Sequence, residues 1–229
     1  MTRAAEAAEI LGVDASLRGH WREVAAQLAP YPAWETAEGP EFAGIGGEEP
    51  KHLPDDHFGE AAFYPTLLAD EVNLDSPQSQ KDMMLRTIRA LRPAGTSSAT
   101  LLLLGVPDDQ AGSRRQRAGE NAETLLNSRS GRIHLFPLAS QTAEVAFRNF
   151  QARGGFLVSA CKNSKGVYHV EILARRDISC RLMNPWPGQP VVVRAVGQTE
   201  SVPVQIDRSN GECLVFAAVA NQKYRVEPE

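Results

Sequence analysis

The spacing of apolar residues changes near residue 128, and this change constrains the fold more than any other feature of the sequence. Before it, apolar residues recur at intervals of three and four, which is typical of one face of an α-helix. After it the interval becomes two, which is typical of β-strands with one buried face. The sequence therefore predicts an α+β protein of two domains, helical over residues 1–128 and an antiparallel β-sandwich over residues 129–229.

Capping and turn residues set the limits of the expected elements. We expect helices over Ala4–Leu11, between Asp14 and Pro30, between Ser76 and Pro93, and over Arg114–Leu126. The stripe of the second helix consists of Leu17, Trp21, Val24 and Leu28, and that of the third consists of Met84, Ile88 and Leu91. We expect a long loop rich in Gly, Pro and Glu over residues 30–65, and loops of this length are usually functional or disordered.

Short alternating segments separated by turn sequences predict about eight strands in the second domain. They are Arg132–Phe136, Phe156–Ala160, Val167–Leu173, Ile178–Met183, Val191–Val196, Val202–Ile206, Cys213–Val219 and Tyr224–Val226. Eight short strands at this spacing are typical of an antiparallel sandwich.

The two parts of the chain differ in net charge, and the total charge bears on which partners the protein can bind. The first 128 residues carry 11 basic and 20 acidic side chains, whereas the remainder carries 13 basic and 8 acidic ones. These opposite net charges are compatible with docking of the two domains on each other. The net charge of −4 argues against a nucleic-acid binder or an anionic-membrane binder. The apolar run Leu101–Val106 is too short to span a bilayer.

Sequence motifs for cofactors and metals are missing. The chain has no G-x-G-x-x-G, G-x-x-x-x-G-K or G-x-S-x-G motif, so we expect neither a bound nucleotide cofactor nor a serine nucleophile. Cys161, Cys180 and Cys213 are widely spaced without a C-x-x-C pair, which predicts buried free thiols rather than a zinc site.

Acidic residues in the long loop are the first candidates for chemistry. Asp56 and Glu60 could serve as a general acid and a general base, with His57 orienting one of them. A solvated acidic loop is the alternative, and it is the commoner arrangement. Asp109 follows an apolar run and could present a base at the rim of a cavity, although a helix or strand that runs into a polar turn is the commoner arrangement.

Two tryptophans are candidates for carbohydrate binding, because aromatic rings stack on sugar faces. Trp34 lies in the long loop, and Trp186 lies between Pro185 and Pro187 in a rigid turn. Trp186 could instead seal the interface between the domains.

Several motifs resemble glycoside hydrolase family 95, the α-L-fucosidase family. They are Ala7–Asp14 (AAEILGVD) with Leu17, Arg18 and Trp21, Leu28–Pro32 (LAPYP), Ala122–Leu126 (AETLL), Gly131–Pro137 (GRIHLFP) and Phe150–Phe156 (FQARGGF). Cys180-Arg181 and Asn184–Gly188 (NPWPG) resemble the carboxyl-terminal domain of barrel relatives of these enzymes. The resemblance runs from about residue 7 to about residue 196 and is most specific over residues 122–188.

The resemblance implies the last helices of an (α/α)6 barrel followed by a small β-sandwich, in enzymes that hydrolyse glycosidic bonds with inversion. The catalytic acid of that family lies in barrel segments before the part matched here. The family's His-rich loop corresponds to Asp55–Glu60, which keeps one histidine out of register. The family's D-G-N-F-G segment corresponds to Gln110–Arg115, which has no acid at the matching place.

We therefore expect a fragment or divergent relative of an inverting glycoside hydrolase that acts on carbohydrate and is inactive alone. The alternatives are a non-catalytic carbohydrate-binding or structural module, and a chain that completes a barrel supplied by another polypeptide. A partial barrel would expose apolar helix faces, so self-association is also expected.

Overall fold

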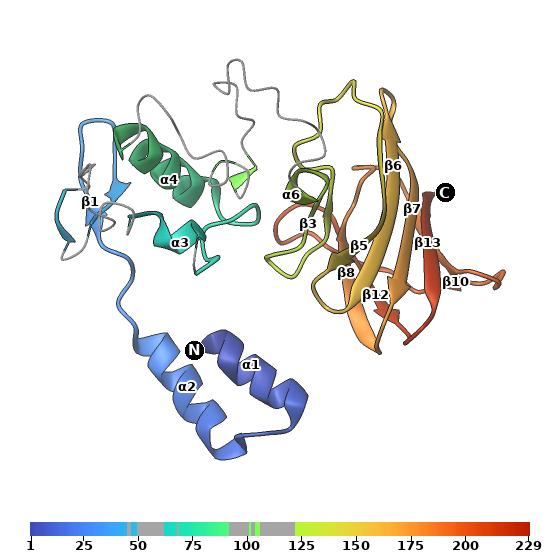
Figure 1. Ribbon diagram of the computed structural model, residues 1–229, viewed down its shortest axis with the longest axis horizontal. Helices are drawn as coiled ribbons and strands as arrows, with labels where there is room; N and C mark the ends of the chain where they lie inside the picture. Colours follow the sequence, from blue (N-terminus) through green and yellow to red (C-terminus); the bar gives the residue numbers. More distant parts are fainter. Residues whose placement is uncertain (45–46, 50–61, 68, 92–100, 102–103, 106–121) are drawn as a thin grey trace.

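The computed structural model describes residues 1–44, 47–49, 62–67, 69–91, 101, 104–105 and 122–229. It has helices in the first half of the chain and antiparallel sheets in the second half, so the predicted α+β class is confirmed (Figure 1). No helix in the described part of the chain has both the length and the apolar character that a membrane span requires.

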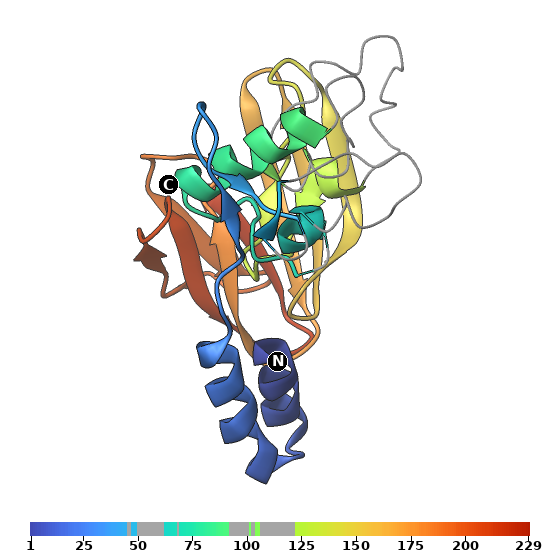
Figure 2. The same cartoon turned by 90° about the vertical axis from the view of Figure 1, so that its left-hand side faces the viewer.

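A helical hairpin opens the chain. It consists of α1 (Thr2–Leu11) and α2 (Ala15–Gln27), which lie side by side and project away from the rest of the molecule (Figures 1 and 2). As expected, α1 ends at Gly12, whose φ of 69° is the left-handed conformation that glycine adopts without strain. Asp14 precedes α2 but makes no side-chain cap. The hairpin buries Ala5 and Ala8, whereas α2 buries none of its residues.

A small helical body follows the hairpin. It contains β1 (Ala33–Trp34), β2 (Glu41–Phe42), α3 (Tyr64–Leu67) and α4 (Gln78–Leu91). The predicted stripe of α4 is confirmed, since Met84, Ile88 and Leu91 are buried against Phe42, Phe63 and Val72. Thr87 fixes β2 on α4, because its hydroxyl accepts a hydrogen bond of 2.8 Å from the Phe42 amide. The expected long loop thus contains a two-stranded β-ribbon.

The β part contains two larger antiparallel sheets and a short β3–β4 ribbon. One sheet has the order β10-β9-β13-β7-β6-β5, and the other has the order β11-β12-β8. The strands are β3 (Leu126–Asn127), β4 (His134–Leu135), β5 (Val145–Ala152), β6 (Phe156–Asn163), β7 (Gly166–Ala174), β8 (Ile178–Met183), β9 (Val191–Ala195), β10 (Ser201–Val202), β11 (Gln205–Asp207), β12 (Cys213–Ala218) and β13 (Lys223–Pro228).

One apolar core serves both sheets. Alternate residues such as Val158 and Ile172 from the six-stranded sheet are fully buried in it, as is Leu182 from the three-stranded sheet. This alternation is the physical origin of the period of two in the sequence. The three cysteines are free, and Cys180 and Cys213 are buried as expected, whereas Cys161 is only half-buried.

The spacing of apolar residues did not predict β5. The strand carries an irregularity at Asn149, where φ is 55° and the register with β6 shifts. A bulge inserts an extra residue, so it interrupts the alternation on which the strand predictions depended.

The predicted helix over residues 114–126 is described only from Ala122. It appears as the short α6 (Ala122–Leu125), and Leu126 belongs to β3. Leu125 and Leu126 pack in the core of the β part, and β3 pairs with β4. The predicted domain boundary between residues 128 and 129 therefore falls inside this small ribbon.

Candidate functional site

Asp70 is the centre of the contact between the helical body, the hairpin and the β part. Its side chain is 3% exposed, and three guanidinium groups surround it. Arg3 of α1 and Arg153 of the β5–β6 turn lie 2.7 and 3.0 Å from Oδ2. Nε of Arg129, which follows β3, lies 3.3 Å from Oδ1. One carboxylate thus joins three segments that are far apart in the sequence.

Local backbone contacts hold Asp70 in place. Its φ of 58° is left-handed, a conformation that Asp tolerates better than most residues. The side-chain amide of Asn73 donates a hydrogen bond of 2.8 Å to the Asp70 carbonyl, and the backbone amide of Glu71 donates one of 2.8 Å to the Pro65 carbonyl. The segment that follows α3 therefore presents Asp70 in a defined orientation.

Asp75 makes a second link between the two halves. Nε2 of His134 lies 3.1 Å from its Oδ2, the Ser130 hydroxyl donates to the same oxygen, and Arg132 lies 3.7 Å from Oδ1. Burial alone would raise the pKa of Asp75. The hydrogen bonds from His134 and Ser130, with the charges of His134 and Arg132, outweigh burial and hold this pKa below its ordinary value.

Arg132 extends this link to the three-stranded sheet. It also lies 3.4 Å from Asp207, which Arg181 contacts at 2.6 Å. Hydrogen bonds from Ser209, with those from Arg181 and the charge of Arg132, lower the pKa of Asp207 to about 2. Acids of the first half thus meet cations of the second half, in agreement with the opposite net charges of the two parts.

Two pockets lie beside these ion pairs. The smaller has a volume of about 400 Å³, and its lining includes Asn73, Asp75, Gln80, Arg132 and Asn210. The larger has a volume of about 840 Å³ and lies against α1, with Arg3, Glu6, Ile10, Arg129 and Arg153 in its lining. The two pockets share Arg3, Asp70, Glu71 and Ser130.

Most of the sequence-predicted site residues are not described. Asp56, His57, Glu60 and Asp109 all lie outside the described residues. Trp34 lies in β1 and is 39% exposed, which leaves part of its ring open to solvent.

Trp186 belongs to the core of the β part. It is 9% exposed, and its indole Nε1 donates a hydrogen bond of 2.7 Å to the Val167 carbonyl. The surrounding turn is ordered by Glu212, which accepts hydrogen bonds from Asn184 and from the Gly188 amide. A buried ring has no open face for stacking on a sugar, so packing explains this tryptophan better than carbohydrate binding does.

The ion pairs of Asp70 and Asp75 could not be predicted from the sequence, because their members are separated by up to 83 positions. The charge asymmetry of the two halves was the one available signal. Within the described residues, no group of three or more His, Cys, Asp or Glu side chains could hold a metal ion.

Comparison with protein-family models found no match, and no curated protein matches the chain.

Removing the Asp70 carboxylate should destabilise the contact between the helical body, the hairpin and the β part. In Asp70→Ala, Arg3, Arg129 and Arg153 lose their shared partner, and we expect the free energy of unfolding to fall by about 3 kcal/mol. Urea denaturation measures this change. Glu227→Ala removes an exposed ion pair with Arg194 and should cost less than about 1 kcal/mol. Equal losses in the two variants would contradict the central role of Asp70.

The stability that Asp75 supplies should depend on pH. Because its pKa is lower in the folded chain, the ionised carboxylate stabilises the fold above pH 3.8, its ordinary value. This contribution is lost as the pH falls through the folded pKa. The difference in unfolding free energy between the native chain and Asp75→Asn should therefore shrink below pH 3.8. Urea titrations at a series of pH values would detect it, and a difference independent of pH would refute it.

Proposed function

We propose that the chain is the carboxyl-terminal part of a family 95-like glycoside hydrolase, and that it binds carbohydrate without cleaving it alone. In this proposal the helical segments are an arc of an (α/α)6 barrel, and the β part is the β-sandwich of that family. The observation that carries the binding function is the smaller junction pocket, which both halves of the chain line.

The lining of this pocket suits a polyhydroxylated ligand. Sugar hydroxyl groups both donate and accept hydrogen bonds, and the amides of Asn73, Gln80 and Asn210 can do the same. Arg132 adds donors and Asp75 adds acceptors. The volume of about 400 Å³ lies within the usual range for small-ligand sites.

The same pocket is poorly suited to hydrolysis. An inverting glycosidase needs a general acid that still carries its proton near neutral pH, and this requires a raised pKa. The contacts of Asp75 lower its pKa instead. Both oxygens of Asp70 are already engaged by guanidinium groups. If the chain does hydrolyse a glycoside, Asp56, Glu60 and Asp109 are our candidate carboxylates, with His57 as an orienting group.

A second candidate function is the completion of a barrel supplied by another polypeptide. The hairpin favours it, because α2 buries none of its residues and large apolar side chains of the hairpin stay exposed. Ile10 of α1 and Leu28, the residue that follows α2, are each 66% exposed. Exposed apolar patches of this kind are typical of partner surfaces.

Carbohydrate binding can be tested in the smaller pocket with two variants of α4. Gln80 lines the pocket, whereas Gln78 of the same helix is not part of its lining. Removing one hydrogen-bonding amide should cost about 1 kcal/mol, so Gln80→Ala should weaken binding about fivefold. Calorimetric titration with methyl α-L-fucoside and methyl β-D-galactoside measures this, and Gln78→Ala should bind as the native chain does.

The outcomes separate binding from catalysis. If neither glycoside binds, the proposed function is wrong. Turnover of an aryl α-L-fucoside that Asp109→Asn or Glu60→Gln abolishes would show that the chain is an active hydrolase and would overturn the non-catalytic part of the proposal.

Barrel completion predicts self-association of the chain through the hairpin. Sedimentation velocity should show a concentration-dependent shift to larger species, because apolar helix faces left in water associate. The double variant Ile10→Ser and Leu28→Ser should remove the shift. Val219→Ser, which changes an exposed apolar residue of the β part, should not. A native chain that stays monomeric at high concentration would contradict the partial barrel.

A further inference from the structure

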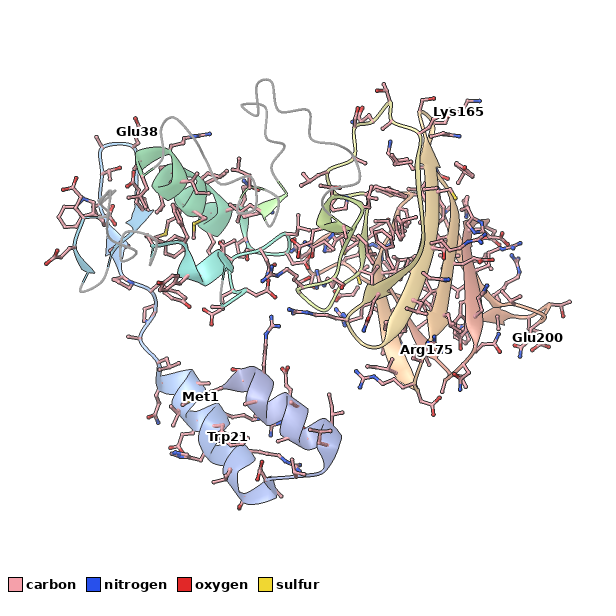
Figure 3. All side chains as sticks on the ribbon, viewed as in Figure 1. Met1, Trp21, Glu38, Lys165, Arg175 and Glu200 are labelled. Carbon is pink, nitrogen blue, oxygen red and sulfur yellow. The ribbon has the colours of Figure 1, made fainter. Side chains whose placement is uncertain are left out.

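The six-stranded sheet has an outer face that is turned away from the core. β6 and β7 place Ala160 and Val170 in the core, so the adjacent residues Cys161 and His169 belong to the outer face. In Figure 3 the hairpin of β6 and β7 ends near the labelled Lys165, and side chains of this sheet extend on the side away from the helical body. A thiol and an imidazole are thus neighbours on the outer face.

The pairing of β6 with β7 places Cys161 and His169 directly opposite each other. Side chains of such a pair have Cβ atoms about 4.5–5.5 Å apart. On the other side of Cys161, β5 presents Ala146, which is exposed and has only a methyl group. The thiol therefore has a base on one side and an open approach on the other.

The Tyr168 hydroxyl shows that the thiol reaches the surface. Tyr168 is the unmatched residue at the irregularity between β6 and β7, and it is 62% exposed. The Cys161 thiol raises the pKa of this hydroxyl, first through a hydrogen bond and then through its charge, and the charge of Glu144 adds to the effect. Lys162 is directed elsewhere, because its ammonium group donates to two backbone carbonyls before β5.

Charged groups of β7 and β13 lie on the other side of His169. Oε2 of Glu171 lies 3.9 Å from Nε2 of the imidazole. Lys223 and Arg225 lie 3.4 and 3.5 Å from the same carboxylate, so its position is fixed from β13. With Nε2 beside Glu171, Nδ1 is the ring nitrogen that can accept a proton from the thiol of Cys161.

The other two thiols lie in different surroundings. Cys180 and Cys213 are buried, and burial raises the pKa of both. The thiolate is the reactive form, and thiols buried in apolar surroundings are unreactive. Of the three cysteines, all of which the structure describes, Cys161 is the one that solvent reaches.

We infer that Cys161 is a modification site, at which the thiol exchanges with a low-molecular-weight disulfide with His169 as the base. Nδ1 of His169 takes the thiol proton, and the Cys161 thiolate attacks one sulfur of the disulfide. A new S–S bond forms on Cys161, the original S–S bond breaks, and the second sulfur leaves as a thiolate that takes up the proton. Cys161 is oxidised and the leaving sulfur is reduced, so the disulfide is the only oxidant required. The inference does not depend on the proposed carbohydrate binding.

The site is tested by treating the folded chain with glutathione disulfide. Intact-mass measurement and peptide mapping should find one glutathionyl group per chain, on Cys161, and dithiothreitol should remove it. Cys161→Ser should stay unmodified, whereas Cys213→Ser should be modified as the native chain is. An adduct on Cys180 or Cys213 instead, or no adduct under conditions that modify the chain in urea, would overturn the inference.

The role of His169 is tested by the rate of exchange as a function of pH. Near neutral pH, His169→Gln should react about tenfold more slowly, because the thiol has lost its base. Above about pH 10 the two rates should converge, since the thiol then ionises without a base. His20→Gln changes an exposed histidine of α2 and should react as the native chain does. In urea all of these chains should react alike.

Each outcome of the rate measurement decides the role of His169. Equal rates for His169→Gln and the native chain near neutral pH would overturn it. A difference that persists unchanged at high pH would show a structural effect of the substitution, also against it. An equal loss in His20→Gln would show a general effect of removing a histidine. If His169→Gln does not fold, as judged by circular dichroism, His169→Asn replaces it.

Discussion

One buried carboxylate, that of Asp70, contacts three separate segments of the molecule. Asp70 is taken almost completely out of water, and an unpaired charge in that position would be strongly unfavourable. Its three arginine partners come from α1, from the segment after β3 and from the β5–β6 turn. The hairpin, the helical body and the β part therefore meet at one buried charge, and Asp75 joins the helical body to the β part a second time.

The ion pairs around Asp75 and Asp207 have a different consequence. They join the helical body to the three-stranded sheet through Arg132, and they favour the ionised form of both carboxylates. A site built on such groups presents fixed charges and hydrogen-bond acceptors. It is better suited to holding a polar ligand than to giving up a proton, and this is the physical basis for proposing binding rather than hydrolysis.

Much of the local structure could be predicted from apolar spacing. The face of α4 that buries Met84 and Ile88 follows from intervals of three and four, and β7 and β8 follow from intervals of two. β5 could not be predicted in this way, because the irregularity at Asn149 breaks its alternation. The candidate site could not be predicted either, since Asp70 looks like an ordinary loop acid until Arg153 lies against it.

The sequence by itself determined the α+β class, the change from helices to strands and the opposite charges of the two halves. These properties depend on near neighbours in the chain and on composition, so they are visible without coordinates. Only the tertiary structure decided that Asp70 and Asp75 meet their basic partners, that Trp186 is buried and that two pockets lie at the junction. Those properties depend on contacts between distant segments, which local patterns do not encode.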